Sequence, residues 1–215
     1  MIRLSFKLPK QIAVAVSGGC DSMAALDFLR RNRDVTVLHY NHGTDFSDSA
    51  EGLVTEYCKL HNLVLVKGEL TDTPDSGQSL EDFWRYHRYS FFNESHGTLP
   101  VITCHHLDDV VETWLFTSLH GNSRLIPSRR DQFIRPFLET RKAVMEDWCE
   151  RKCVPYIDDP SNNDVRFMRN YIRHELIPKA LRVNPGIYKV LRKKLKQNET
   201  PVWSKDWTER NSEMT

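Results

Sequence analysis

Residues 12–26 read IAVAVSGGCDSMAAL, and this stretch decides the fold. Five apolar residues predict a buried strand, two adjacent glycines predict a tight turn, and the residues from Met23 predict a helix. A strand that runs through a glycine turn into a helix aims backbone N–H groups and the positive end of the helix dipole at one point. The stretch therefore predicts an anion site, and phosphate is the expected anion.

The turn differs from two well-known phosphate loops. A Walker A loop ends in Lys-Ser or Lys-Thr, and this turn has no lysine; it also lacks the glycine spacing of the dinucleotide fingerprint. Ser17 and Ser22 add hydroxyl donors, and the Asp21 carboxylate fits beside a phosphate when a cation lies between them. The purely structural alternative is a strand–turn–helix junction in which Asp21 and Ser22 cap the helix.

Composition limits the protein class. The 215 residues, 40% of them hydrophobic, suffice for one α/β domain with a modest appendage. The net charge is +1, yet residues 166–197 hold ten Lys and Arg against one acid, which predicts either a polyanion-binding surface or a solvated helix face. The five scattered cysteines are typical of a reducing cytoplasm, and no apolar run is long enough to span a membrane.

Predicted strands and helices alternate along the chain. Apolar strands between helices indicate an α/β fold, with a Rossmann-like parallel sheet covered by helices on both faces. The expected strands cover residues 12–16, 35–40, 63–66 and 100–104, and the expected helices cover 23–31, 48–61, 80–94, 107–119, 140–152 and 167–181. Residues 122–137 predict a loop or hairpin. We expect a nucleotide-binding core over 1–138, a small basic helical extension over 139–197 and a flexible tail over 198–215.

Polar side chains follow two of these strands, where ligands bind in parallel sheets. Residues 39–43 read HYNHG, and residues 103–113 read TCHHLDDVVET. Asp109 and Glu112 are three apart and share a helix face, although the helix dipole alone also favours acids in a first turn. With Asp21 they predict a Mg²⁺ site, because Mg²⁺ takes one or two carboxylates plus substrate phosphates.

Arginines stand on two further helical segments. Glu81, Arg85 and Arg88 share one face, which is either a salt-bridged surface or a contact to phosphate or RNA. On the same helix we expect a core-facing stripe of Phe83, Tyr86 and Phe91. Residues 156–164 predict turns, and Arg169 and Arg173 follow one helical turn apart, a spacing that can pin phosphates.

Seven motifs in one order resemble the tRNA(Ile)-lysidine synthetase family, a branch of the PP-loop or N-type ATP pyrophosphatases. The resemblance covers roughly residues 10–182. The motifs are Ser-Gly-Gly-x-Asp-Ser at 17–22, His-x-Asn-His-Gly at 39–43, Glu-x-x-x-Arg-x-x-Arg-Tyr at 81–89, His-His-x-Asp-Asp-x-x-Glu-Thr at 105–113, Arg-Pro-Phe-Leu at 135–138, Asp-Pro-Ser-Asn at 159–162 and Arg-Asn-x-x-Arg at 169–173.

The resemblance implies an adenine nucleotide alpha hydrolase-like fold and a ligase reaction. ATP would adenylate the carbonyl oxygen of the wobble cytosine in a CAU-anticodon tRNA(Ile), and free lysine would attack carbon 2 and expel AMP to give lysidine. Implied ATP contacts are Ser17, Gly18, Gly19, Asp21, Ser22 and His105. Implied catalytic residues are Asp21, Asp109, Glu112, Arg169 and Arg173, with Mg²⁺ at Asp21 and Asp109. Implied substrate or RNA contacts are Asn41, His42, Arg85, Arg88, Asp159 and Asn162.

Some features depart from the family pattern. Residues 120–123 read HGNS where the family often has Arg-Gly-x-Gly. Family members use further C-terminal domains to contact the tRNA body, and we expect the basic stretch up to Gln197, or a second subunit in a homodimer, to supply such contacts. The proton acceptor for the attacking lysine stays open among His42, His105, His106 and a carboxylate.

Two other functions stay open from the sequence. One is a PP-loop ATPase that acts on another RNA base or nucleotide, for example in thiolation, although the absence of Cys-x-x-Cys argues against an iron–sulfur thiolase. The other is a nucleotide- or RNA-binding module without activity. The presence of Asp21, Asp109, Glu112 and both arginines argues against such decay.

Overall fold

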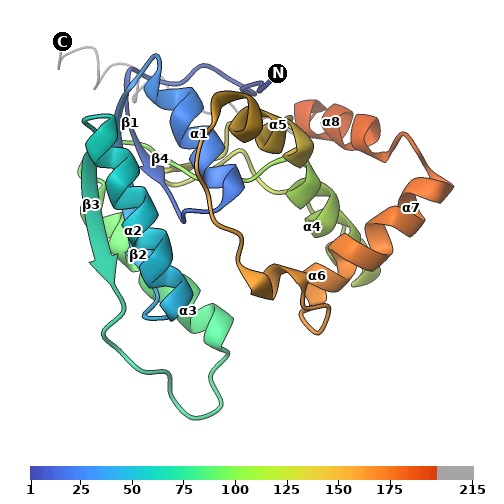
Figure 1. Cartoon of the computed structure of the whole chain (residues 1–215). Coiled ribbons are helices and arrows are strands. Elements are labelled where there is room, and N and C mark those ends of the chain that lie inside the picture. Colours follow the sequence, from blue (N-terminus) through green and yellow to red (C-terminus); the bar gives the residue numbers. More distant parts are fainter. Residues whose placement is uncertain (198–215) are drawn as a thin grey trace.

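A six-stranded sheet in the order β3-β2-β1-β4-β6-β5 forms the centre of the computed structural model, which describes residues 1–197 (Figure 1). All neighbouring strands are parallel except β5, which pairs antiparallel with β6. The elements are β1 (Gln11–Ala15), α1 (Cys20–Arg30), β2 (Asp34–Asn41), α2 (Asp45–Leu60), β3 (Val64–Glu69), α3 (Leu80–Ser95), β4 (Val101–Ile102), α4 (Leu107–Leu119), β5 (Arg129–Arg130), β6 (Phe133–Ile134), α5 (Lys142–Lys152), the 3-10 turn Pro160–Asn163, α6 (Met168–Tyr171), the π-helical turn Ile172–Leu176, α7 (Ile177–Val183) and α8 (Ile187–Gln197).

The predicted α/β class, with a mainly parallel sheet between helices, is confirmed. The tail expected at 198–215 lies outside the described residues, and the division of the chain at residue 138 stays a prediction. No helix of the described part is both long and apolar enough to cross a membrane. All five cysteines lie within this part and are free thiols.

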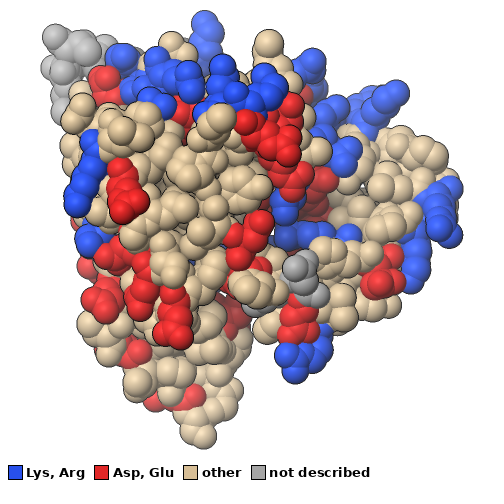
Figure 2. Space-filling model, in the orientation of Figure 1, with Lys and Arg blue, Asp and Glu red and all other residues tan. Residues whose placement is uncertain are grey.

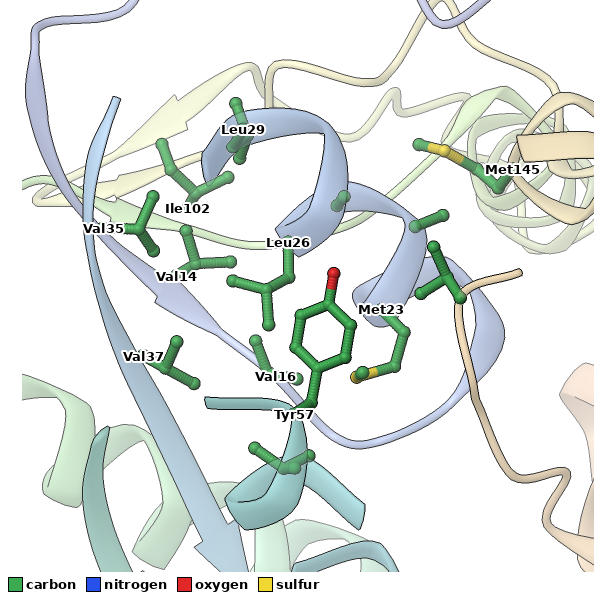
Figure 3. Close-up of a cluster of buried hydrophobic side chains, with 14 of the residues drawn as sticks. Val14, Val16, Met23, Leu26, Leu29, Val35, Val37, Tyr57, Ile102 and Met145 are labelled. Carbon is green, nitrogen blue, oxygen red and sulfur yellow. The ribbon is translucent and has the colours of Figure 1, made fainter. Parts of the chain in front are cut away.

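Alternation along β1 builds a core on each face of the sheet. Ile12 and Val14 point to the face covered by α1, α2 and α5, whereas Ala13 belongs to the cluster under α3. Figure 3 shows Met23 and Leu26 of α1 lying against Val14 and Val16 at the centre of the first cluster. Each fully buried side chain of this size contributes about 2 kcal/mol of burial free energy, so this packing fixes α1 on the end of β1.

The sheet edge and α3 differ from the sequence prediction in two details. The sequence predicts fully apolar, buried strands. β3 is instead half-exposed, because it lies at the edge of the sheet and has a neighbouring strand, β2, on one side only. In α3, Phe83 is buried and Phe91 packs on the cluster, but Tyr86 is 68% exposed, so the predicted core stripe is wrong at that position.

Residues 122–137 contain more structure than the predicted loop or hairpin. β5 and β6 form a hairpin, but β6 also pairs parallel with β4 and so belongs to the main sheet. Phe133 and Ile134 are buried there. A two-residue strand is too short for periodicity to reveal, and it forms because β4 offers a free edge.

The helix predicted at 167–181 is confirmed as one continuous helical run over 168–183. Its regular α-helical geometry is interrupted by a π-helical turn between α6 and α7. Pro178 provides a physical reason, because it lacks the N–H that an α-helix would donate to the carbonyl of His174 and its ring crowds that carbonyl. One wider turn relieves this conflict.

Helix α8 packs on α4 through a separate apolar cluster. Leu191 and Leu195 of α8 contact the cluster that contains Leu107 and Val111 of α4. Tyr188 of α8 donates from its hydroxyl to Asp108 at 2.9 Å, and the Arg141 guanidinium lies 3.3 Å from the centre of the Tyr188 ring. The basic C-terminal helix is therefore attached to the helix that carries the acidic motif.

Asp27 joins α1 to two neighbouring helices. Its buried carboxylate accepts hydrogen bonds from Tyr57 of α2 at 2.7 Å and Trp148 of α5 at 2.9 Å, and it pairs with Arg30 and Arg31. Burial opposes ionisation, but the hydrogen bonds from Tyr57, Arg31 and Trp148 outweigh it and lower the pKa of Asp27.

We predict that Asp27→Asn lowers the free energy of unfolding by about 3 kcal/mol, because it leaves buried donors without a charged acceptor. Since the folded-state pKa is lowered, the carboxylate stabilises the wild type above the ordinary Asp pKa of about 3.9, and this contribution is lost as the pH falls through the folded-state value. Urea unfolding between pH 3 and 7 measures both effects. Equal stability of the two proteins at pH 7 would contradict the prediction.

Candidate active site

The turn between β1 and α1 leaves the start of α1 open to a ligand. Gly18 has a φ of +86°, which favours glycine, and Gly19 is the N-cap residue, with no side-chain cap on the helix. The Ser22 hydroxyl instead donates to the Gly19 carbonyl at 2.9 Å and accepts from the Ser17 N–H at 3.2 Å. The structural alternative, in which Asp21 and Ser22 cap α1, is therefore wrong, and the first-turn N–H groups can face an anion.

Two distant segments hold this turn in place. A Cβ atom on Gly18 would lie 3.0 Å from the Cβ of Ala50 in α2, so α2 packs directly against the turn. On another side, the Ile157 N–H donates to the Gly18 carbonyl at 3.1 Å. The backbone of the loop therefore has little freedom to move or to accept a side chain.

His106 connects the loop to the acidic motif on α4. Its ring is 2% exposed; Nε2 lies 3.4 Å from Asp21 Oδ2, and Nδ1 lies 3.2 Å from Asp109 Oδ2. Burial opposes protonation of the ring, but the Asp109 and Asp21 carboxylates raise the pKa of His106 to about 9. The same contact acts on Asp21, where burial opposes ionisation but the hydrogen bond from His106 lowers the pKa.

Glu112 is paired with both predicted arginines. Its carboxylate lies 3.0 Å from Arg169 Nε and 3.0 Å from an Arg173 nitrogen, and Arg173 also lies 3.4 Å from Asp109 Oδ1. Burial raises the pKa of Glu112, and the two arginines oppose that shift. The predicted shared face of Asp109 and Glu112 is thus confirmed, and the sequence-distant arginines come to the same place.

The carboxylates fit a Mg²⁺ ion that takes some of its ligands from a nucleotide. Asp21 Oδ1 is buried and has no hydrogen-bond partner within residues 1–197, although Oδ2 contacts His106. In the described part of the chain, no three or more His, Cys, Asp or Glu side chains form a group that could hold a metal by themselves. This arrangement suits Mg²⁺, which often combines one or two carboxylates with phosphate oxygens and water.

Two further histidines are held in neutral form: His105, which precedes His106, and His42, which follows β2. Burial lowers the pKa of each ring to about 4. His105 Nδ1 lies 3.1 Å from the Thr103 hydroxyl. His42 Nε2 lies 3.4 Å from an Arg88 nitrogen, and its ring lies 5.4 Å from that of Trp84.

Asn41 and Arg85 make contacts that a structural role explains. The Asn41 amide group donates to Asp48 and Glu51 and accepts from Gly43 N and Ser47 Oγ, so the chain itself uses its hydrogen-bonding capacity. The exposed Arg85 lies with its guanidinium carbon 4.8 Å from the Tyr89 ring centre. Their predicted contacts to substrate stay predictions.

Asp159 and Asn162 lie on the segment that leaves the Gly18 contact and leads to α6. The Asn162 N–H donates to the Asp159 carbonyl at 3.0 Å, and His174 contacts the Asn162 carbonyl at 3.0 Å. This segment therefore connects the turn at Gly18 to the helix that carries Arg169 and Arg173. The predicted RNA contacts of the two residues stay predictions.

His106 is a site residue that the sequence motifs indicate only as a possible proton acceptor. Its position three residues before Asp109 is a signal, because residues N-cap and N3 of a helix can bond each other reciprocally. Here the His106 N–H donates to Asp109 Oδ2 at 2.9 Å, and the Asp109 N–H lies 3.3 Å from His106 Nδ1. Nothing local indicates the second contact, to Asp21.

Comparison with known proteins assigns the chain to a family. The model of the PP-loop domain family matches residues 4–180. The chain belongs to the PP-loop domain family. Within it, the chain is 33% identical over 195 residues to tRNA(Ile)-lysidine synthase of Thermotoga sp. (strain RQ2), covering 83% of this chain and 47% of that protein. It is 34% identical over 199 residues to tRNA(Ile)-lysidine synthase of Geobacter sulfurreducens (strain ATCC 51573 / DSM 12127 / PCA), covering 84% and 42%.

This PP-loop chain spans less than half the length of the curated relatives that it matches. Among solved structures, NH3-dependent NAD synthetase from Campylobacter jejuni subsp. jejuni NCTC 11168, in complex with the nitrate ion, gives a TM-score of 0.46 at 12% identity, covering 93% of this chain and 91% of that one.

We predict that Gly18→Ala lowers nucleotide affinity by about tenfold or more. A left-handed alanine costs about 1–2 kcal/mol, and its methyl group would press on Ala50 and shift the loop. Titration with a fluorescent ATP analogue and urea unfolding measure the two effects. Gly77→Ala is a matched control, because Gly77 has the same φ of +86° but its added methyl group would have no atom of the described residues within 4 Å. Wild-type nucleotide affinity in Gly18→Ala would refute the prediction.

Proposed function

We propose that this chain carries the catalytic domain of an ATP-dependent ligase that converts the wobble cytidine of a CAU-anticodon tRNA(Ile) to lysidine. The observation that carries the proposal is the convergence of the open α1 N-terminus, Asp21, Asp109 and the paired arginines at one end of the sheet. Similarity to tRNA(Ile)-lysidine synthases over most of the chain supports the choice of substrate.

In this proposal, the loop binds ATP through its hydrogen-bond donors and the positive end of the α1 dipole. The N–H groups at the start of α1 and the Ser17 and Ser22 hydroxyls hold phosphate oxygens. Arg169 and Arg173, which pair with Glu112 in this structure, turn toward the triphosphate, to which guanidinium groups can donate two parallel hydrogen bonds. His105 contacts the nucleotide in neutral form.

Adenylation breaks the bond between the α and β phosphates and forms a bond from the cytosine carbonyl oxygen to the α phosphorus. Asp21 and Asp109 would hold a Mg²⁺ ion, which would supply positive charge to offset the negative charge of the leaving pyrophosphate. Arg169 and Arg173 add further positive charge for the phosphate chain. The cytosine leaves the anticodon loop to reach the site, at a cost of a few kcal/mol at most.

Lysine then attacks carbon 2 of the activated base through a neutral amine, and AMP leaves with the bonding electron pair. The amine proton passes to an acceptor in the site. His42 and His105 are held neutral and are candidates for this role.

The basic C-terminal helices provide a surface for the tRNA backbone. Lys and Arg gather along the upper edge and over the α7–α8 side of the face in Figure 2. Exposed members on these helices include Lys179, Arg182, Lys189, Lys193, Lys194 and Lys196. Such contacts depend on salt because phosphate binding releases counterions. A second subunit is the alternative source of these contacts and stays a prediction, as does a cytoplasmic location.

We predict that the protein joins radiolabelled lysine to a CAU-anticodon tRNA(Ile) transcript in the presence of ATP and Mg²⁺. Asp21→Ala lowers the initial rate by about 100-fold or more, because it removes a carboxylate from the metal and phosphate site. Asp45→Ala is a matched control, since Asp45 stands in the first turn of α2 as Asp21 does in α1. Its rate should equal that of the wild type.

The outcomes separate the candidate functions. Pyrophosphate release with total RNA but without lysine incorporation would replace the proposal with ATP-dependent activation of another RNA base. Nucleotide binding without pyrophosphate release on any RNA would indicate a binding module and would refute the enzyme proposal.

A further inference from the structure

We propose that His106 is a positioning residue that fixes Asp21 and Asp109 so that each presents one carboxylate oxygen to the metal–nucleotide complex. The inference rests on the proposed function, since it concerns how that site holds Mg²⁺. It assigns a role to a buried side chain that contacts the two proposed metal ligands.

The first argument is how the ring divides its two nitrogens. Nε2 contacts Asp21 at the start of α1, and Nδ1 contacts Asp109 in the first turn of α4. These helices follow different strands, β1 and β4, and the residues are 88 positions apart. A rigid, planar ring between the two carboxylates therefore sets their separation and orientation, whereas flexible side chains would not.

The second argument is which oxygens the ring leaves available. His106 uses Oδ2 of Asp21 and Oδ2 of Asp109. Among the described residues, Oδ1 of Asp21 is buried and finds no partner, and Oδ1 of Asp109 contacts Arg173 at the long distance of 3.4 Å. A buried carboxylate oxygen without a partner carries a desolvation cost, and a cation at this point would remove that cost.

The third argument is that helix capping alone does not require the Asp21 contact. The reciprocal cap on α4 uses the His106 backbone N–H, Nδ1 and the Asp109 carboxylate. Asn or Ser would make the same cap, and both are preferred over most residues at this position. A side chain as long as His is needed to reach from the N-cap position to Asp21. Helix capping therefore does not explain the contact between His106 Nε2 and Asp21.

The test separates the cap from the Asp21 contact. His106→Asn and His106→Ser keep the cap and lose the donor at the Nε2 position. His106→Gln places an amide nitrogen near the former Nε2 and so restores the donor to Asp21. His120→Asn is the matched control, because His120 stands at the opposite end of α4 and is exposed.

The readout is binding of α,β-methylene ATP, which the enzyme cannot cleave, by isothermal titration calorimetry with Mg²⁺ and with EDTA. The ratio of the two affinities is the Mg²⁺ enhancement. We expect His106→Asn and His106→Ser to reduce the enhancement by about 10- to 100-fold, as loss of a group that orients a metal ligand does. Their affinities in EDTA should stay at the wild-type value. His106→Gln should recover most of the enhancement, and His120→Asn should keep all of it.

Two results would overturn the inference. One is wild-type Mg²⁺ enhancement in His106→Asn and His106→Ser. The other is an equal loss of affinity with Mg²⁺ and with EDTA in both variants and in His106→Gln, which would indicate general damage to the loop. Equal affinity of the wild type for the analogue with Mg²⁺ and with EDTA would also overturn the inference. The proposed function would still be decided separately, by lysine incorporation.

Discussion

The left-handed turn at Gly18 is the constraint on which the rest of the site depends. Its φ of +86° directs the chain from β1 into α1 with the first-turn N–H groups open, and only glycine adopts it without strain. Ala50 of α2 packs against the turn, and the segment at Ile157 bonds its carbonyl. Three parts of the chain that are distant in sequence therefore meet at one residue without a side chain. A shift of this turn would move the loop, α2 and the segment that leads to Arg169 and Arg173 together.

The charges around this turn balance one another before any ligand binds. The acids Asp21, Asp109 and Glu112 face His106, Arg169 and Arg173. A nucleoside triphosphate and a divalent cation bring charges of both signs. They can therefore bind by exchanging ion-pair partners, in which the cation takes carboxylate oxygens and the phosphates take guanidinium groups. Exchange avoids leaving a buried charge unpaired at any step, and an unpaired buried charge would cost several kcal/mol.

The sequence predicted what local patterns and chain order determine. The glycine turn, the apolar strand β1 and helix α4, with its predicted bounds at Leu107 and Leu119, all have strong local signals. What it could not predict depends on tertiary neighbours. β6 is two residues long and forms by pairing with the edge of β4 that β1 leaves open. The π-helical turn before Pro178 results from a conflict between a missing donor and a helix that continues beyond it. The contact from His106 to Asp21 joins two helices that no periodicity connects.

The attachment of α8 gives the basic surface a fixed relation to the chemistry. Tyr188 of α8 donates a hydrogen bond to Asp108, the residue directly before Asp109 in the motif, and Leu191 packs on α4. The exposed lysines of α8 therefore stand on a helix that is anchored one residue from a proposed metal ligand. An RNA backbone held by those lysines would have its position set relative to Asp109 by packing rather than by a flexible linker. Since the effectiveness of positioning depends on holding reacting groups within a fraction of an ångström, this attachment is the structural link between RNA binding and base activation in the proposed function.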